Sequence, residues 1–284
     1  MKEKNKGIIF ICATPIGNLE DVSFRLISTL KEVDLVLAED TRTTRKLLSR
    51  YEIKKKDLLS CHQHINNKKI NHIIKILKDG KKAALVSESG MPAIQDPGYR
   101  IINECIKNDI TITVIPGPSA VLSALVLSGL PTDSFIFIGF LPRTKEKRKQ
   151  KIGEISNLPY TLIFYESPKR IERTIKNLIL LLGNRQAALV REMTKVYEET
   201  VRGDLEGILE NISQRNIKGE MVLVVEGGKD GLIKEYTDKD IEKQILKLMG
   251  EGLSKKNALK IIKSRYDIDR QKLYNISTKF RIDN

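Results

Sequence analysis

Short apolar runs alternate with helical periods along the first part of the chain, and this alternation is what most constrains its fold. Residues 8–13 and 34–39 read as strands, and residues 22–33 between them read as an amphipathic helix. The alternation continues as helix, strand, helix and strand at residues 71–79, 81–87, 99–108 and 110–116. Strands that are apolar throughout are buried on both faces, so the pattern predicts a mostly parallel sheet covered by helices.

The second half of the chain predicts another α/β layer. A helical period at residues 120–129 and a strand at 135–140 lead into it. Further strands are expected at residues 161–166, 187–193, 197–203 and 219–227, with a helix at 169–183. Two of these strands follow each other without room for a crossover helix, so part of this sheet should be antiparallel.

Beyond Gly231 the strand patterns stop, and the tail reads as three short basic helices that resemble a small helix-turn-helix module. We therefore expect an α/β protein with three parts. Residues 1–118 form the N-terminal α/β domain, residues 119–231 form the second α/β domain, and residues 232–284 form a basic helical extension.

The chain is strongly basic, with 50 lysines and arginines against 36 acidic residues and a net charge of +14. Such a charge attracts polyanions, RNA among them. Lysine is used heavily everywhere, so local clustering is a better guide than the total. The densest block, residues 143–151, fits either an RNA contact or a solvated linker or helix face.

Cysteines and histidines give little sign of a metal or of disulfides. Cys12, Cys61 and Cys105 lie far apart without C-x-x-C spacing, which favours reduced structural thiols. His62 and His64 stand two apart, but no third ligand has suitable spacing, so a surface role or an RNA contact is favoured and no metal is expected. No apolar run approaches the length of a membrane span, so we expect a cytoplasmic protein.

Loops rich in glycine and proline follow several of the predicted strands. They read TPIGNLED, SESGMPAIQDPG and PGPSA, whereas neither G-x-G-x-x-G nor G-x-x-x-x-G-K-[ST] occurs. Ligands of open α/β sheets bind outside the carboxyl ends of the strands, where these loops must gather. Any one of the loops could simply end its strand, but three of them together predict one wall of a binding cleft.

These loops also carry a family resemblance. The segments TPIGNLED, AEDTR, SESGMPAIQDPGYR, IPGPSA, GFLPR, FYESPKR and KGEMVLVVEG occur in this order between Ile8 and Gly227. The chain resembles the branch of the tetrapyrrole methylase superfamily that methylates the ribose 2′-hydroxyl of a cytidine in 16S ribosomal RNA. AEDTR and FYESP together are specific to that branch. The resemblance implies a homodimeric enzyme that holds S-adenosylmethionine between its two α/β domains.

The same resemblance implies which residues bind the cofactor. Loops of glycine and proline let a ligand approach backbone donors and acceptors closely, which suits this role. The residues implied are Ile16, Gly90, Met91, Pro92, Pro116, Gly117, Ser119, Ala120, Tyr165, Glu192 and Glu220. The chain departs from the family in one of these loops, because Glu88, Ser89 and Met91 replace the aspartate, alanine and threonine of SDAGTP. Backbone contacts should survive these changes.

Methyl transfer to a ribose requires the hydroxyl to be aligned with the methyl group and its proton to be removed. The candidates for the base are Glu39, Asp40, Glu166 and Lys195, and the sequence does not choose among them. Helix capping is the alternative role for Glu39 and Asp40, since acids favour helix N-termini. Arg42, Arg143 and Lys169 are the residues expected to contact RNA phosphates.

Two other functions remain open at this point. A small tetrapyrrole substrate would keep the fold, but members acting on porphyrins usually carry a GxGPGD form where this chain has TPIGNLED. A catalytically silent RNA-binding assembly factor would explain Glu88 and Met91 as marks of a damaged cofactor loop. The loop nevertheless keeps Gly90, Pro92 and the DPG turn at Asp96, so we expect it to bind the cofactor.

Overall fold

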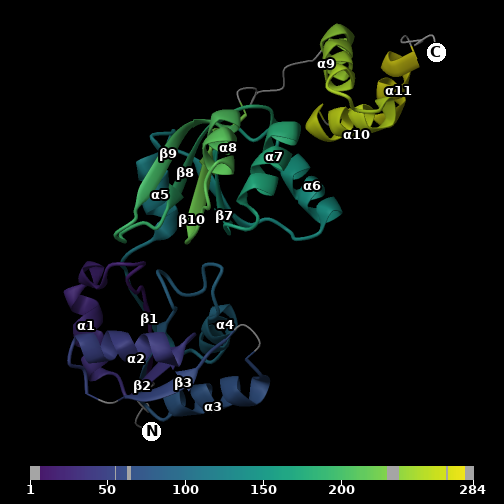
Figure 1. The fold of residues 1–284 in the computed structure, drawn as a ribbon. Coiled ribbons are helices and arrows are strands. Elements are labelled where there is room, and N and C mark those ends of the chain that lie inside the picture. Colours follow the sequence, from purple (N-terminus) through teal and green to yellow (C-terminus); the bar gives the residue numbers. More distant parts are fainter. Residues whose placement is uncertain (1–6, 55, 63–64, 229–236, 267, 279–284) are drawn as a thin grey trace. The chain divides into compact units, whose positions relative to one another are not determined.

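The computed structural model describes residues 7–54, 56–62, 65–228, 237–266 and 268–278 of the chain (Figure 1). They form two compact units. The first unit runs to Ser123 and also includes Glu192–Glu198, and the second contains Ala124–Arg191 and the chain from Glu199 onward. The division thus falls a few residues after the boundary expected at residue 118. In addition, the segment Glu192–Glu198, which was expected in the second domain, belongs to the first unit.

The first unit is built on a parallel sheet, as predicted. Its strands are β1 (Ile8–Cys12), β2 (Leu35–Ala38), β3 (Asp57–Ser60), β4 (Lys82–Val86) and β5 (Thr111–Ile115). They lie in the order β3-β2-β4-β1-β5, and every neighbouring pair is parallel. The edge strand β3 was not predicted, because its four residues DLLS are too short to show a period.

Helices cover both faces of this sheet. They are α1 (Phe24–Glu32), α2 (Thr41–Arg50), α3 (Asn67–Lys78) and α4 (Tyr99–Lys107), whereas the short helix η1 (Leu19–Asp21) has no buried residue. Apolar side chains of α3 and α4 pack with Ile9 and Ile11 of β1 on one face, whereas those of α1 and α2 pack with Cys12 on the other. This alternation along β1 is the period of two that a strand buried on both faces requires.

The second unit contains a mixed sheet, which confirms the expected antiparallel pairing. Its elements are β6 (Phe135–Phe140), α6 (Lys145–Glu154), β7 (Thr161–Glu166), α7 (Ile171–Leu182), β8 (Gln186–Arg191), β9 (Glu199–Asp204), α8 (Leu205–Ser213) and β10 (Met221–Val225). The order is β6-β7-β10-β8-β9, in which only β6 and β7 are parallel. Helix α5 (Ala120–Ser128) crosses the division between the units, and Arg202 of β9 donates to the carbonyl of Leu127 near its end.

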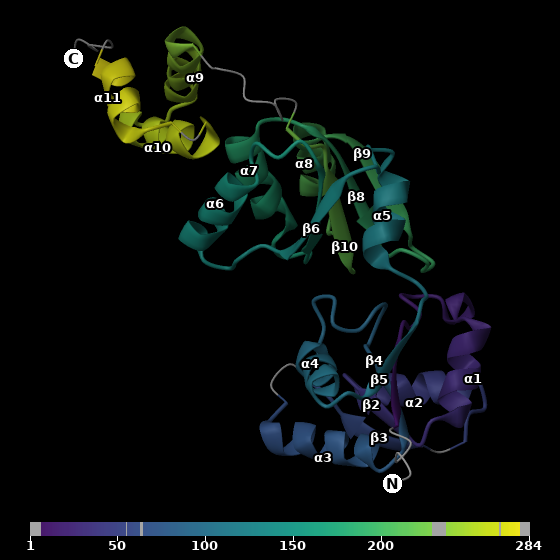
Figure 2. The ribbon, with the colours of Figure 1, turned by 180° about the vertical axis from the view of Figure 1, so that it is seen from behind.

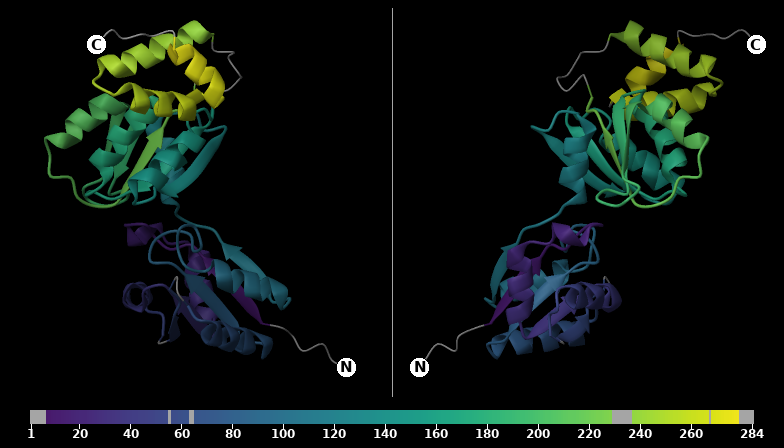
Figure 3. Two further views of the ribbon diagram at one scale, coloured as in Figure 1. Left: turned by 90° about the vertical axis from the view of Figure 1, so that its right-hand side faces the viewer. Right: turned by 60° about the vertical axis from the view of Figure 1, so that its left-hand side comes forward.

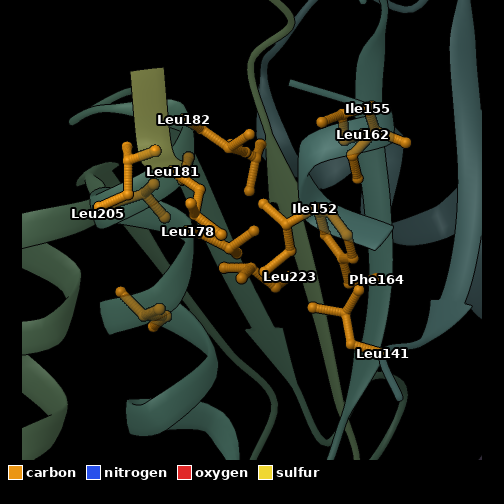
Figure 4. Close-up of a cluster of buried hydrophobic side chains, with 14 of the residues drawn as sticks. Leu141, Ile152, Ile155, Leu162, Phe164, Leu178, Leu181, Leu182, Leu205 and Leu223 are labelled. Carbon is orange, nitrogen blue, oxygen red and sulfur yellow. The ribbon is translucent and has the colours of Figure 1, made fainter. Parts of the chain in front are cut away.

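The core of the second unit lies between its sheet and helices α6, α7 and α8. Figure 4 shows Phe164, Leu178 and Leu223 pointing into it from β7, α7 and β10. The expected three helices of the tail are present as α9 (Asp238–Gly250), α10 (Lys255–Tyr266) and α11 (Arg270–Thr278). Their buried side chains belong to the same cluster, so the extension is packed into the second unit (Figure 3). In the residues that the structure describes, no helix has the length and apolarity to cross a membrane.

Candidate active site

Three loops leave neighbouring strands at the carboxyl edge of the first sheet. They follow β4, β1 and β5, which lie side by side. The backbone amide of Thr14 donates to the carbonyl of Gly90 at 2.9 Å, and that of Gly90 donates to Thr14 at 3.1 Å. The amide of Ala13 donates to the carbonyl of Ile115, also at 3.1 Å. Backbone hydrogen bonds therefore join the starts of the three loops.

Glycines allow this close approach. Gly90 has a φ of +79°, and a Cβ added to it would lie 3.4 Å from Cγ2 of Ile16. A Cβ added to Gly117 would lie 3.0 Å from that of Ala13. The structure thus brings together the residues of this unit's three loops that were expected to bind the cofactor, which are Ile16, Gly90, Met91, Pro92, Pro116, Gly117, Ser119 and Ala120.

The departures from the family loop leave its backbone contacts in place. Glu88 donates its backbone amide to Oε2 of Glu39 at 3.2 Å, a contact that any residue at this position can make. Met91 packs against the core of the first sheet, as an apolar side chain should. The replaced side chains therefore do not disturb the pairing of Thr14 with Gly90.

The loop after β4 is held in a strained conformation. Ala93 and Gln95 have φ values of +69° and +65°, in the left-handed region, which costs non-glycine residues about 1 kcal/mol or more each. At its end Gly98 has a φ of +137°, and a Cβ there would lie 2.9 Å from Cδ2 of Leu85. The conformation-fixing residues of SESGMPAIQDPG thus fold the loop back onto its own strand, and strain of this kind is common at functional sites.

Four carboxylates influence one another around the ends of β2 and β4. Burial raises the pKa of Glu39; the hydrogen bond from the amide of Glu88 opposes this rise, and the charges of Glu88 and Asp40 add to it. Burial also raises the pKa of Asp96 to about 7, and the charge of Glu39 adds to the rise, while a hydrogen bond from Ser87 lowers it. The sequence analysis did not propose Asp96 for the chemistry, because its burial follows only from the folded loop.

Asp40 has the capping role that was the alternative expected for it. Its side chain accepts from the backbone amide of Arg42 at 2.7 Å, as the N-cap of α2. Its carboxylate also lies 2.7 Å from Nη2 of Arg42, whose side chain is 83% exposed. Hydrogen bonds from Arg42 lower the pKa of Asp40 to about 2. This pair holds the exposed guanidinium at the start of α2.

The segment Glu192–Glu198 contacts the loop after β1. The amide of Asn18 donates to Oγ1 of Thr194 at 3.0 Å, and a Cβ on Gly17 would lie 2.7 Å from Cγ of Lys195. Two candidate residues meet here, since Nζ of Lys195 lies 3.0 Å from Oε1 of Glu192. Glu192 and Thr194 also have positive φ values, 49° and 65°.

In the second unit, Glu166 is fully enclosed at the end of β7. It accepts from Oγ1 of Thr174 at 2.6 Å and from the amide of Ser167 at 2.9 Å, and Nε of Arg170 lies 3.2 Å from its Oε1. None of its side chain is exposed. These contacts fix the turn from β7 into α7.

Tyr165 lies next to Glu166 in β7 and makes edge contacts with the rings of Phe137 and Phe140 of β6. Glu220 is exposed and directly precedes β10, whose first residue pairs with Glu166. Tyr165 and Glu220 are therefore at the same end of the second sheet, whereas Glu192, which was also expected in the second domain, belongs to the first unit.

Arg143 and Lys169 are exposed on the loops that follow β6 and β7. Arg170 ties these loops together by donating from Nη2 to the carbonyl of Leu141 at 2.6 Å. Arg148, buried on α6, donates to the carbonyl of Arg143 at 2.9 Å. Buried Arg148 and half-buried Arg170 thus fix the backbone of the loop that carries Arg143, and Arg170 joins it to the loop that carries Lys169.

Metal ligands and cavities add no further candidate at these loops. In the part of the chain that the structure describes, no three His, Cys, Asp or Glu side chains are grouped to hold a metal. His62 is exposed, and His64 lies outside the described residues. A polar cavity of about 380 Å³ is lined by Arg185, Gln186 and Lys247, among others, and lies at the opposite end of the second sheet from Glu166.

Comparison with known proteins identifies the family. A profile of the Tetrapyrrole (Corrin/Porphyrin) Methylases matches residues 9–209. The structure resembles that of uroporphyrin-III C-methyltransferase from Thermus thermophilus complexed with S-adenyl homocysteine. The TM-score is 0.53 at 17% identity, over 78% of this chain and 97% of the other.

Two curated relatives have a more specific name, ribosomal RNA small subunit methyltransferase I. The protein of Halalkalibacterium halodurans is 44% identical over 96% of this chain and 95% of its own length. The protein of Thermotoga maritima is 43% identical over 78% of this chain and 99% of its own length. The chain therefore belongs to the tetrapyrrole methylase family, in the group of the ribosomal RNA small subunit methyltransferase I proteins.

Proposed function

We propose that this protein uses S-adenosylmethionine to methylate ribosomal RNA of the small subunit, at the ribose 2′-hydroxyl of a cytidine in the decoding region of 16S RNA. The observation that carries the proposal is the 44% identity to the Halalkalibacterium halodurans relative along nearly the whole of both chains. The motifs AEDTR and FYESP, which resemble the 2′-O-methylating branch, support the finer assignment to a cytidine ribose.

We assign the cofactor to the joined loops of the first unit. The gathering of Ile16, Gly90 and Gly117 supports this, because glycines there leave backbone groups open to a ligand. Glu192, Tyr165 and Glu220 are proposed as the further contacts. When bound, S-adenosylmethionine supplies a methyl group on a positively charged sulfur, and the carboxylates of Glu39, Glu88 and Asp96 favour a cation nearby.

Among the four candidate bases we propose Glu39. Burial raises its pKa, which makes its carboxylate a stronger proton acceptor. Asp40 is a much weaker base because hydrogen bonds from Arg42 lower its pKa to about 2. Glu166 has no exposed side-chain surface with which to meet a substrate. Lys195 is paired with Glu192 and would have to give up this ion pair before accepting a proton.

Arg42, Arg143 and Lys169 are proposed to hold RNA phosphates. All three are exposed; Asp40 pairs with the side chain of Arg42, and Arg148 and Arg170 fix the backbone of the loop that carries Arg143. Preordered cations lose less side-chain entropy when they bind a phosphate.

The test is methyl transfer from labelled S-adenosylmethionine to 16S RNA and to isolated small subunits, followed by nucleoside analysis. We expect 2′-O-methylcytidine from the wild-type protein. Glu39→Gln should lower kcat by roughly 10²- to 10⁴-fold while cofactor binding, measured by calorimetry, stays within a factor of about three.

Other outcomes would point to the other functions. Label in a precorrin but not in RNA would indicate a tetrapyrrole methyltransferase. RNA binding without any heat of cofactor binding would indicate a silent assembly factor. Methylation on a base would overturn the ribose assignment alone.

A further inference from the structure

Helix α10 of the extension is a basic helix with one exposed lysine face. Its sequence, KKNALKIIKSRY, contains no acidic residue. Lys256, Lys260 and Lys263 are exposed and follow one another at helical spacing, opposite the buried Ala258 and Ile262. The lysines therefore form a stripe on the side of the helix that faces away from the core.

This helix lies against α6, which contains most of the densest basic block of the chain, residues 143–151. Contacts join α10 to α6 and α7, and Figure 2 shows the three helices together. The approach is close, since a Cβ on Gly153 of α6 would lie 2.1 Å from Oγ of Ser264. Lys145 and Lys147 of α6 are exposed, and Arg143 lies two residues before the first residue of this helix. Two basic helices that are far apart in the sequence are thus in contact.

We propose that the exposed lysines of α10 and α6 form one surface that binds the phosphate backbone of the RNA substrate. The proposal rests on the proposed function. Two lysine-rich helices in contact repel each other, and a polyanion across both would remove that repulsion. Arg143 lies just before α6. An RNA strand bound to the lysines of both helices could therefore also contact Arg143 and, on the neighbouring loop, Lys169.

In this proposal the extension increases the affinity for RNA and takes no part in methyl transfer. The family profile ends at residue 209, before α9 begins at Asp238. The Thermotoga maritima relative is matched along 99% of its length by 78% of this chain. A protein of this group therefore exists without a counterpart for about a fifth of the present chain, which fits an added RNA-binding surface.

Substitution is the suitable test, because deleting the extension would also remove core side chains such as Ile245 and Ile262. The triple variant K256Q/K260Q/K263Q keeps good helix formers in α10. K256R/K260R/K263R keeps the charge. The matched control is K54Q/K75Q/K78Q, which removes three exposed lysines from the first unit, at and near the amino edge of its sheet.

Affinity for a 16S RNA fragment is measured by fluorescence titration at several salt concentrations. We expect the α10 glutamine variant to bind about tenfold more weakly at ~0.1 M salt. The slope of log affinity against log salt should become shallower by about 0.7 to 0.9 for each phosphate that the variant no longer neutralises. The arginine variant and the control should stay within about twofold of wild type.

An equal loss of affinity in the glutamine variant and in the control would show a response to net charge only and would overturn the proposal. Unchanged affinity in the glutamine variant would overturn it as well, even if the protein methylates RNA normally. Wild-type binding to anionic lipid vesicles but not to RNA would assign the surface to a membrane instead. Failure of the proposed function is seen separately, as wild-type protein that binds RNA without methylating it.

Discussion

The carboxyl group of Asp96 makes the stability of the first unit depend on pH. Burial raises its pKa from 3.8 to about 7. Between these values the folded protein keeps a proton that the unfolded chain has released, so this group makes the protein less stable as pH rises from about 4 to about 7. The loss of stability from this group is complete about one pH unit above its folded-state pKa.

We predict that Asp96→Asn makes the protein more stable than wild type at pH 8, because the amide removes the cost of a buried negative charge. The gain should be on the order of 2 kcal/mol, less than the full shift would give since solvent still reaches the group, and should shrink towards pH 4. Urea unfolding at pH 4, 6 and 8 measures it. Asp133→Asn, which removes an exposed carboxylate, is the control. A gain that is the same at every pH would contradict the prediction.

At the scale of elements, the segment Glu192–Glu198 holds the loop after β1 in place. Gly17 leaves no room for a side chain, because a Cβ would lie 2.6 Å from Oγ1 of Thr194 and 2.8 Å from the carbonyl oxygen of Met193. The two segments must therefore move apart if any other residue occupies this position.

We predict that Gly17→Ala lowers the free energy of unfolding by roughly 1 to 3 kcal/mol, the usual cost of an overfilled contact. Gly250→Ala is the matched control, since a Cβ there meets nothing within 4 Å and alanine is the better helix former. Chemical denaturation followed by circular dichroism compares the two. Equal stabilities of both variants would mean that the contact between Gly17 and Thr194 is loose.

Sequence patterns predicted the elements well and their long-range contacts poorly. The apolar runs predicted the parallel sheet, and the acids of AEDTR indicated the cap that Asp40 forms. The sequence did not predict that Glu192–Glu198 belongs to the first unit, because apolar periodicity does not indicate which unit a loop contacts. The raised pKa of Asp96 and the contact of α10 with α6 depend on tertiary burial, which local sequence does not encode.

For the whole molecule, we predict a homodimer that uses α5. Leu122 and Val126 are one helical turn apart and are 52% and 74% exposed, so together they offer an apolar patch that a second copy can cover. The double variant Leu122→Glu and Val126→Glu should therefore be monomeric in sedimentation experiments. Ile106→Glu on α4, at a position 60% exposed, should remain dimeric. A monomeric wild-type protein would contradict the expectation.

The return of Glu192–Glu198 to the first unit means that the polypeptide passes between the units three times, at Ser123–Ala124, Arg191–Glu192 and Glu198–Glu199. A gene fragment that stops after α5 would encode the first sheet without the segment Glu192–Glu198, which contacts Gly17 and Asn18. Neither half of this protein is thus a contiguous module that recombination can exchange with a single crossover.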